Sequence, residues 1–487
     1  MTTFSRRSFI AGISAVPFAL WLEQNGVLAQ PPRVRPNVMS TQGQAMLNIY
    51  SNAVKTMMAT PEPNPVGWLF QWYIHGVRDD RGKASELARV YSTPSARKTL
   101  ATLTWDTCQA HIDPAMEDFF LPWHRMYLFF FERIIQKVSG NSSFALPYWD
   151  YTNSSSPSGP RLPNKFISPA NATNPLFRTN RRATVNAGNP IDASSPGVLN
   201  LNSLAQCSYS KVGVVQGFNR HLDSNLHGTV HVLVGNAMGM GQVPWAANDP
   251  IFWLHHCNID RLWASWNDAG RKNPMTSAWL NKTFTFADEN GVKVIAKVKD
   301  FNKIMPLHYR YEELAPVPAC PPGSGAVGPP RIRARVATAL QLTTTPAKAR
   351  LLPPPSPAAG VGNLAERVRN LTGNRRLYLV ITRLSAQEAP GTVFDVFLEL
   401  PAGASGTAAE ANKIGTIHFF DAVRHSGHAP ATANANQKFF SFDITDLAKR
   451  LVSEGRLTAT PELTIAPADE VNATSRPVVG EITLVEQ

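Results

Sequence analysis

Histidine side chains in three apolar segments are the residues of this chain best suited to chemistry. His227 and His231 stand four residues apart, so on a helix both imidazoles point the same way, as a metal clamp requires. His124 and the pair His255 and His256 lie in apolar stretches with the spacing of buried helices, where an imidazole needs a partner. Neutral imidazoles suit copper, zinc or nickel, whereas calcium, magnesium and iron–sulfur centres prefer oxygen or thiolate ligands. The pattern therefore indicates a transition-metal site.

The three segments, in this order, resemble the tyrosinase and polyphenol oxidase family, which includes the catechol oxidases and belongs to the type 3 dinuclear copper proteins. The resemblance rests on FLPWHRMYLFFFE (120–132), HGTVH (227–231) and DPIFWLHHCNIDRLW (249–263), and it covers residues 40–315. It implies a mainly α core, a four-helix bundle that holds two copper ions, with O2 as co-substrate. A pair of zinc sites with three histidines each is the alternative.

The resemblance also implies which histidines hold the copper ions. His111 fits only if the loop IDPAMED carries a four-residue insertion relative to the usual family spacing, and no other histidine lies between His75 and His124. The Asp-Pro-x-Phe pattern places the last ligand at His256, and leaves His255 and Asp260 as support behind the ligands. The expected copper A ligands are His75, His111 and His124, and the expected copper B ligands are His227, His231 and His256.

Two smaller expectations concern side chains next to these ligands. Some family members join a cysteine near this point to a copper-binding histidine by a thioether, which makes Cys108 and His111 a candidate pair. His221 is six residues before His227, off the face of the helix that carries the ligands, and is expected to be structural.

The same resemblance places the substrate pocket. Phe252 is expected to stack near the substrate ring, Val243 matches the family's gate position, and Val232 is expected to line the pocket. In many tyrosinases an asparagine directly after the first copper B ligand helps a carboxylate hold the water that takes the phenol proton. Here that position is Gly228, and Asp223 is the candidate carboxylate. We therefore expect oxidation of o-diphenols to o-quinones to exceed ortho-hydroxylation of monophenols.

Two function classes remain open at this stage. One is a copper enzyme that acts on small phenols, and the other is a reversible oxygen carrier like the haemocyanins. Carriers usually form large repeated assemblies, whereas this chain has one copper core, which favours the enzyme. The net charge of +12 does not indicate nucleic acid as a partner, because the basic residues are scattered along the sequence.

The N-terminus predicts export. The sequence SRRSFI (5–10) precedes a short apolar run and Val27-Leu28-Ala29, so residues 1–29 are interpreted as a signal for the twin-arginine translocase, with a basic tail as the alternative. No later stretch reaches the roughly 20 apolar residues of a membrane span. We expect a periplasmic or secreted protein.

The C-terminal part changes character. The catalytic domain is expected over 30–315, a Pro-rich linker over 316–374, and an antiparallel β-sandwich over 375–487, in which VFDVFLEL (393–400) looks like a segment of the C-terminal domain of plant polyphenol oxidases. We expect this sandwich to cover the copper cleft as a lid, with an aromatic or apolar side chain as the plug; the alternative is that it only stabilises the core or helps assembly.

The sequence leaves the roles of some cysteines and histidines open. One disulfide is possible, with Cys207 and Cys320 as candidates, but the sequence does not decide the pairing. His418, His425 and His428 are expected to be ordinary sandwich or loop residues, with a surface metal site as the alternative.

Overall fold

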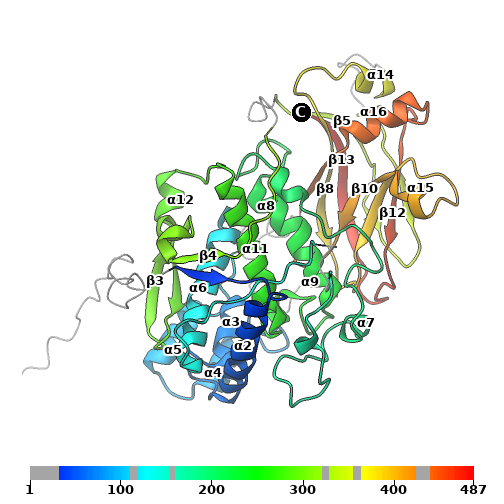
Figure 1. Cartoon of the computed structure of the whole chain (residues 1–487). Coiled ribbons are helices and arrows are strands. Elements are labelled where there is room, and N and C mark those ends of the chain that lie inside the picture. Colours follow the sequence, from blue (N-terminus) through cyan, green and yellow to red (C-terminus); the bar gives the residue numbers. More distant parts are fainter. Residues whose placement is uncertain (1–31, 110–117, 154–158, 321–327, 355–363, 424–438) are drawn as a thin grey trace, which may run out of the picture.

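The computed structural model describes residues 32–109, 118–153, 159–320, 328–354, 364–423 and 439–487. The expected signal (1–29), His111, His425 and His428 lie outside the described residues. Within the described ranges, no helix is both long enough and apolar enough to cross a membrane. Figure 1 shows a helical core with a β-sheet domain packed against one of its sides.

Helices that are apolar on nearly every side form the centre of the core. α6 (Phe120–Ser139) and α11 (Ile251–Asp268) are buried except at their C-terminal ends, as expected for helices without a polar face. Pro122 in the first turn and Gly140, left-handed at φ 67°, mark the two ends of α6. The other core helices are α2 (Thr41–Ala59), α3 (Trp68–His75), α4 (Lys83–Val90), α5 (Ala96–Thr104), α7 (Ala183–Asn186), α8 (Phe218–Leu222), the π-turn η4 (Asp223–His227), α9 (Gly228–Val234), α10 (Val243–Ala246), α12 (Ser277–Asn281) and α13 (Val298–Phe301).

The carboxylate of Asp260, on α11, forms hydrogen bonds with side chains from both ends of the core sequence. β1 (Arg33–Arg35) and β4 (Tyr309–Tyr311) pair in parallel beside it. Burial by itself raises a carboxyl pKa, yet the nearby arginine charges hold the pKa of Asp260 below its ordinary value. This ionised carboxylate therefore fixes α11, the helix that carries His255 and His256. It accepts hydrogen bonds from Arg35 (3.1 Å), Tyr309 (2.6 Å), Arg125 and Tyr311.

Two antiparallel sheets form the C-terminal domain. One sheet has the order β10-β9-β12-β7 and the other β11-β8-β13-β5, with β6 beside β13. The predicted fold class, a mainly α core followed by an antiparallel β-sandwich, is confirmed. The strands are β5 (Arg331–Arg335), β6 (Leu340–Gln341), β7 (Ala347–Arg350), β8 (Leu377–Ser385), β9 (Phe394–Leu398), β10 (Lys413–Ile417), β11 (Phe440–Asp443), β12 (Glu462–Pro467) and β13 (Val478–Glu486), with helices α14 (Leu364–Arg369), α15 (Gly406–Glu410) and α16 (Thr445–Ser453); β2 (Thr283–Ala287) and β3 (Lys293–Lys297) form a hairpin in the core.

Residues 316–374, which were predicted to form a linker, contain strands of the C-terminal sheets. β5 and β7 lie inside that range as edge strands, paired with β13 and β12. Their sequences, RIRAR and AKAR, are basic, and charge at a sheet edge discourages pairing with further strands. The prolines around these short strands obscured their strand character in the sequence. The C-terminal domain therefore begins at β5 rather than at residue 375.

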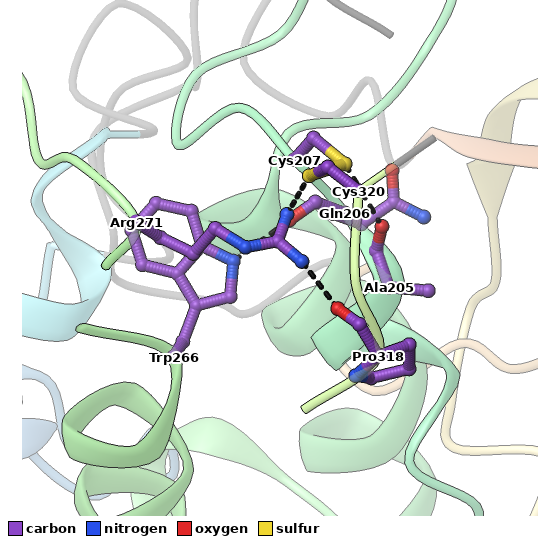
Figure 2. The surroundings of a disulfide bond; sticks show 7 residues. All are labelled: Ala205, Gln206, Cys207, Trp266, Arg271, Pro318 and Cys320. Atoms are coloured by element: carbon purple, nitrogen blue, oxygen red, sulfur yellow. Dashed lines mark hydrogen bonds between the residues drawn. A yellow bond between two sulfur atoms is a disulfide. The ribbon is translucent and has the colours of Figure 1, made fainter. Parts of the chain in front are cut away.

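A disulfide joins Cys207 to Cys320 across 113 residues of sequence (Figure 2). The other two cysteines, Cys108 and Cys257, are buried and take no part in this disulfide. Arg271, which follows α11, donates hydrogen bonds to Cys320 Sγ and to the carbonyl oxygen of Pro318, the latter at 2.5 Å. The end of the core is thus fixed before the chain enters the C-terminal domain.

We expect Asp260→Asn to destabilise the protein by about 3 to 5 kcal/mol, because it removes the counter-charge of buried Arg125 and leaves buried Arg35 paired with Glu132 alone. The shift of the urea unfolding midpoint measures this loss. The exposed Arg450–Glu454 pair serves as the control, and Glu454→Gln should leave the midpoint unchanged. Equal behaviour of the two variants would contradict the role assigned to Asp260.

Candidate metal centre

One group of metal-binding side chains gathers where α3 and α6 meet. His75 ends α3, His124 lies in the first turns of α6, and Cys108 follows α5. Their ligand atoms all lie within 4.8 Å of one another. His75 Nδ1 donates to the carbonyl oxygen of Val243 at 3.2 Å, and His124 Nδ1 donates to that of Phe120 at 2.8 Å. Because a carbonyl can only accept, these bonds place the proton on Nδ1 and make Nε2 the nitrogen with which each ring could bind a metal.

Cys108 lies closer to His124 than the sequence suggested. Its Sγ is 3.6 Å from His124 Nε2. The expected partner of its thioether, His111, is outside the described residues, so that bond and the third copper A ligand stay predictions. A soft sulfur atom beside an imidazole suits copper in either case.

A second group lies on η4, α9 and α11. It contains His227, His231, His255 and His256, whose ligand atoms also lie within 4.8 Å of one another. His231 Nδ1 donates to the carbonyl oxygen of Met240 at 2.9 Å. His227 Nδ1 lies 3.2 Å from the carbonyl oxygen of Asp223 and 3.1 Å from its carboxylate. Among the described residues, the Nε2 atoms of His227, His231 and His256 have no hydrogen-bond partner.

The two groups form one centre. The rings of His124 and His256 stack with centroids 4.3 Å apart and an interplanar angle of 9°. His255 instead lies against His227, at 5.4 Å, and Tyr151, at 5.5 Å. The sequence placed His255 behind the ligands, while the structure brings it into the second group. His256 is the one of the two whose ring stacks on the first group, which is consistent with the predicted choice of His256, and that choice stays a prediction.

The electrostatics favour neutral imidazoles. Burial lowers the pKa of His231, His255 and His256 well below the ordinary value, and neighbouring histidines lower it further. Buried nitrogens with lone pairs and no proton partner are costly unless a metal fills the space between them. The donor set is therefore the one that copper binds well, and these residues fit a pair of copper ions.

Two of the expected pocket residues, Phe252 and Val243, contact the histidines of this centre. Phe252 lies 4.2 Å from the ring of His256 and 4.9 Å from that of His75. The Val243 carbonyl holds His75, and Val232 on α9 is 6% exposed. From the sequence, these residues could be assigned to the pocket only through the resemblance to the family.

Asp223 is more constrained than the sequence implied. Its carboxylate contacts His227 on one side and Arg220, at 3.1 Å, on the other. Burial opposes its ionisation, but the hydrogen bond with His227 and the charge of Arg220 lower its pKa below the ordinary value. The carboxylate is thus placed to orient His227. His221, expected to be structural, is buried and hydrogen-bonded to Ser203 at 2.9 Å, and burial lowers its pKa to about 4.

Sequence reasoning missed which residues of the C-terminal domain reach this centre. Phe420, just after β10, stacks on His231 with centroids 4.1 Å apart and an angle of 16°, and it meets His227 edge-on at 5.8 Å. Beside it, His418 packs against Gly228. Only the apolar dipeptide Phe419-Phe420 after a strand could have signalled this, and such pairs are common in ordinary cores.

Comparison with known proteins agrees with this geometry. The common central domain of tyrosinase matches residues 68–269, the polyphenol oxidase middle domain matches 275–320, and a domain of unknown function matches 333–487. The tyrosinase HcTyr1 of Hahella sp. is 31% identical over 444 residues, which cover 86% of this chain and 91% of that protein. The chain therefore belongs to the tyrosinase and polyphenol oxidase family, the copper-dependent enzymes that oxidise phenols.

Solved structures share the whole fold. A latent aurone synthase (polyphenol oxidase) overlays with a TM-score of 0.60 at 20% identity, over 94% of this chain and 90% of that one. A functional unit of octopus haemocyanin overlays with a TM-score of 0.51 at 17% identity, over 93% and 99% of the two chains. The fold alone therefore does not separate an oxidase from an oxygen carrier.

We expect His231→Ala or His256→Ala to lower bound copper from about two ions per chain to about one, because each removes an imidazole ligand. Elemental analysis of the purified protein measures this. The control is His221→Gln, a buried histidine on the neighbouring helix, which should keep both ions. His255→Gln tests which of the two neighbouring histidines, His255 or His256, binds copper. If His255→Gln loses copper and His256→Gln does not, the assignment of His256 is wrong.

Proposed function

We propose that this enzyme oxidises o-diphenols to o-quinones with O2, and that it hydroxylates monophenols at the ortho position more slowly. The observation that carries the proposal is the pair of adjoining imidazole groups in a buried aromatic pocket. Two o-diphenols together give up four electrons and four protons, which reduce one O2 to two water molecules. Zinc has no redox chemistry to offer such a substrate, so copper fits the proposal better than the zinc alternative.

The chain's own residues prepare the site for this reaction. When bound, the copper ions supply the redox chemistry and the positions that bind O2. Carbonyl oxygens of Val243, Phe120 and Met240 fix three imidazoles in one tautomer. Phe252 offers an aromatic edge beside His256, and the buried rings around it exclude water from the reacting atoms. Orientation and exclusion of water are therefore built in before the substrate arrives.

The preference for o-diphenols rests on two residues. Gly228 stands where many hydroxylating relatives are expected to have asparagine, and the Asp223 carboxylate is engaged by His227 and Arg220. A carboxylate held in this way is a poor proton acceptor for a phenol. An o-diphenol depends less on such a base, because its oxidation requires no new C–O bond.

We expect turnover of L-dopa to exceed that of tyrosine by at least about tenfold, since the proton-accepting group is not positioned for hydroxylation. Quinone absorbance measures both rates, and it also separates an oxidase from an oxygen carrier, which would give no quinone. Gly228→Asn should raise the ratio of tyrosine to L-dopa turnover. Similar rates on the two substrates in the unmodified protein would refute the preference.

We further propose that the chain is latent, with the C-terminal domain as a lid and Phe420 as the plug. Phe420 is 1% exposed and stacks directly on an expected copper B ligand. The gap left beside it, lined by Val232 and Gly391 among others, holds about 10 Å³. This gap borders Phe420 and not the histidines, so the stacking contact is what supports Phe420 as the plug. Because Phe420 covers the face of His231 at 4.1 Å, a phenol ring would have to displace it to reach that face.

The lid is held at its rim by polar contacts between the two domains. Arg182 forms an ion pair with Asp469, and Ser195 donates to Asp395 at 3.0 Å. Gln216 on the core donates to the carbonyl oxygen of Phe439 at 2.5 Å. Because the lid is tethered, its effective concentration at the cleft is high even if each contact is weak.

We expect Phe420→Ala to raise catechol turnover of the full chain by about tenfold or more, because it removes the tethered competitor. Cleavage at a protease site placed between Cys320 and Arg331 should do the same, since it divides neither sheet and spares the disulfide. Copper content should not change. Phe419→Leu is the matched control: this ring packs on Phe394 inside the sandwich, so latency should persist. Equal or lower turnover after cleavage and separation of the pieces would leave the alternative, a lid that only stabilises.

We also propose export through the twin-arginine pathway to the periplasm or the medium. The motif Arg6-Arg7 motivates this, and a disulfide between Cys207 and Cys320 is typical of an oxidising compartment. Fractionation of expressing cells tests the location, and a wholly cytoplasmic protein would contradict it.

A further inference from the structure

His418 reaches from the C-terminal domain onto the helix that carries the copper B ligands. It follows β10 and is fully buried. Its Nε2 donates to the carbonyl oxygen of Ser224 at 2.7 Å, and its Nδ1 lies 3.3 Å from the backbone nitrogen of Phe420, from which it accepts a hydrogen bond. Both ring nitrogens are therefore used, and the ring cannot turn without losing one of these bonds. The same ring supports the backbone of Phe420, the proposed plug.

Gly228 lies directly beneath this ring. A Cβ atom at this position would lie 2.0 Å from His418 Cε1 and 2.5 Å from Nε2, distances that atoms cannot adopt. The backbone itself does not call for glycine, because φ is −65° and ψ is −30°, as in any helix. Alanine is in fact a better helix former than glycine. The close approach of His418 is therefore what a side chain at 228 would disturb.

The turn before Gly228 supplies the hydrogen-bond acceptor for His418. η4 is a π-turn, and the backbone N–H of Gly228 is directed to the carbonyl oxygens of Asp223 and Asn225. In an α-helix the same N–H would bond to Ser224. Here the Ser224 carbonyl accepts from His418 instead. The local winding of this helix and the missing side chain at 228 together form the surface on which His418 rests.

We propose that Gly228 and the Ser224 carbonyl form a docking seat for His418, and that any side chain at 228 opens the lid. This inference rests on the proposed lid. Position 228 directly follows the copper ligand His227, so it also borders the substrate. The residue there can leave room for His418 or place a side chain beside the substrate, but not both. Gly228 thereby links the latency of the enzyme to its choice between o-diphenols and monophenols.

The test uses the full chain with the protease site between Cys320 and Arg331, and compares catechol turnover before and after cleavage. For the unmodified chain the ratio of the two rates is expected to be large. Gly228→Ala should lower this ratio by about tenfold or more, because the uncut variant is already open. The ratio cancels any effect of the substitution on chemistry itself. The assay is run at low protein concentration, where the cut pieces are no longer tethered and separate; gel filtration at high concentration gives a second measure, in which the unmodified pieces should still associate and the Gly228→Ala pieces should not.

A double variant distinguishes a collision between residue 228 and His418 from a general loss of structure. His418→Ala makes room for a Cβ at 228 but loses the bond to Ser224, so it opens the lid by itself. Adding Gly228→Ala to His418→Ala should then change the ratio no further, since the atoms that would collide are gone. Additive effects of the two substitutions would overturn the proposed seat.

The outcomes also distinguish the two proposals. If cleavage does not raise turnover in the unmodified chain, the lid itself is wrong. If cleavage raises turnover but Gly228→Ala retains the full ratio and its pieces stay together, the lid stands and the seat is wrong. A thermal melting temperature of Gly228→Ala equal to or above that of the unmodified chain excludes misfolding as the cause of an open lid.

Discussion

Backbone carbonyl groups that accept the Nδ1 protons of buried histidines are the interaction on which the rest of this protein depends. Each such bond selects one tautomer and turns the other nitrogen toward the space between four helices. An imidazole at the surface would exchange freely between water and metal. Here burial removes water as a partner, so the Nε2 lone pairs of His227 and His231, which have no hydrogen-bond donor among the described residues, are costly without an ion and the bound state is strongly favoured. The apolar runs of α6 and α11 are what make that burial possible.

Much of this could be predicted from the sequence, because the relevant signals are local. The high proportion of large apolar residues in 120–135 and 251–266 predicts buried helices, and the four-residue spacing of His227 and His231 predicts a shared face. The choice of His256 over its neighbour required a family pattern, since both histidines are equally apolar in context. The structure then showed that only one of them lies between the two groups.

What could not be predicted depends on contacts between distant segments. The approach of Phe420 to His231 joins residues far apart in the chain, and nothing in the local sequence of either reveals it. The edge strands β5 and β7 were hidden because they are short, basic and surrounded by proline, which is how sheet edges avoid unwanted pairing. The pairing of Cys207 with Cys320 is likewise a property of the folded chain, since spacing alone does not select partners.

The Cys207–Cys320 bond closes a loop that contains every expected copper B ligand as well as α11. The disulfide closes a loop of 113 residues, which lowers the conformational entropy of the unfolded chain. By the chain-entropy argument, this stabilises the folded chain by about 5 kcal/mol. That advantage belongs to the core alone, because the crosslink ends before the first strand of the sandwich. The half of the metal site that Phe420 of the C-terminal domain contacts thus lies inside a loop that is closed without that domain. We therefore expect undocking of the C-terminal domain and disassembly of the metal site to be separate thermodynamic events, with separate energies.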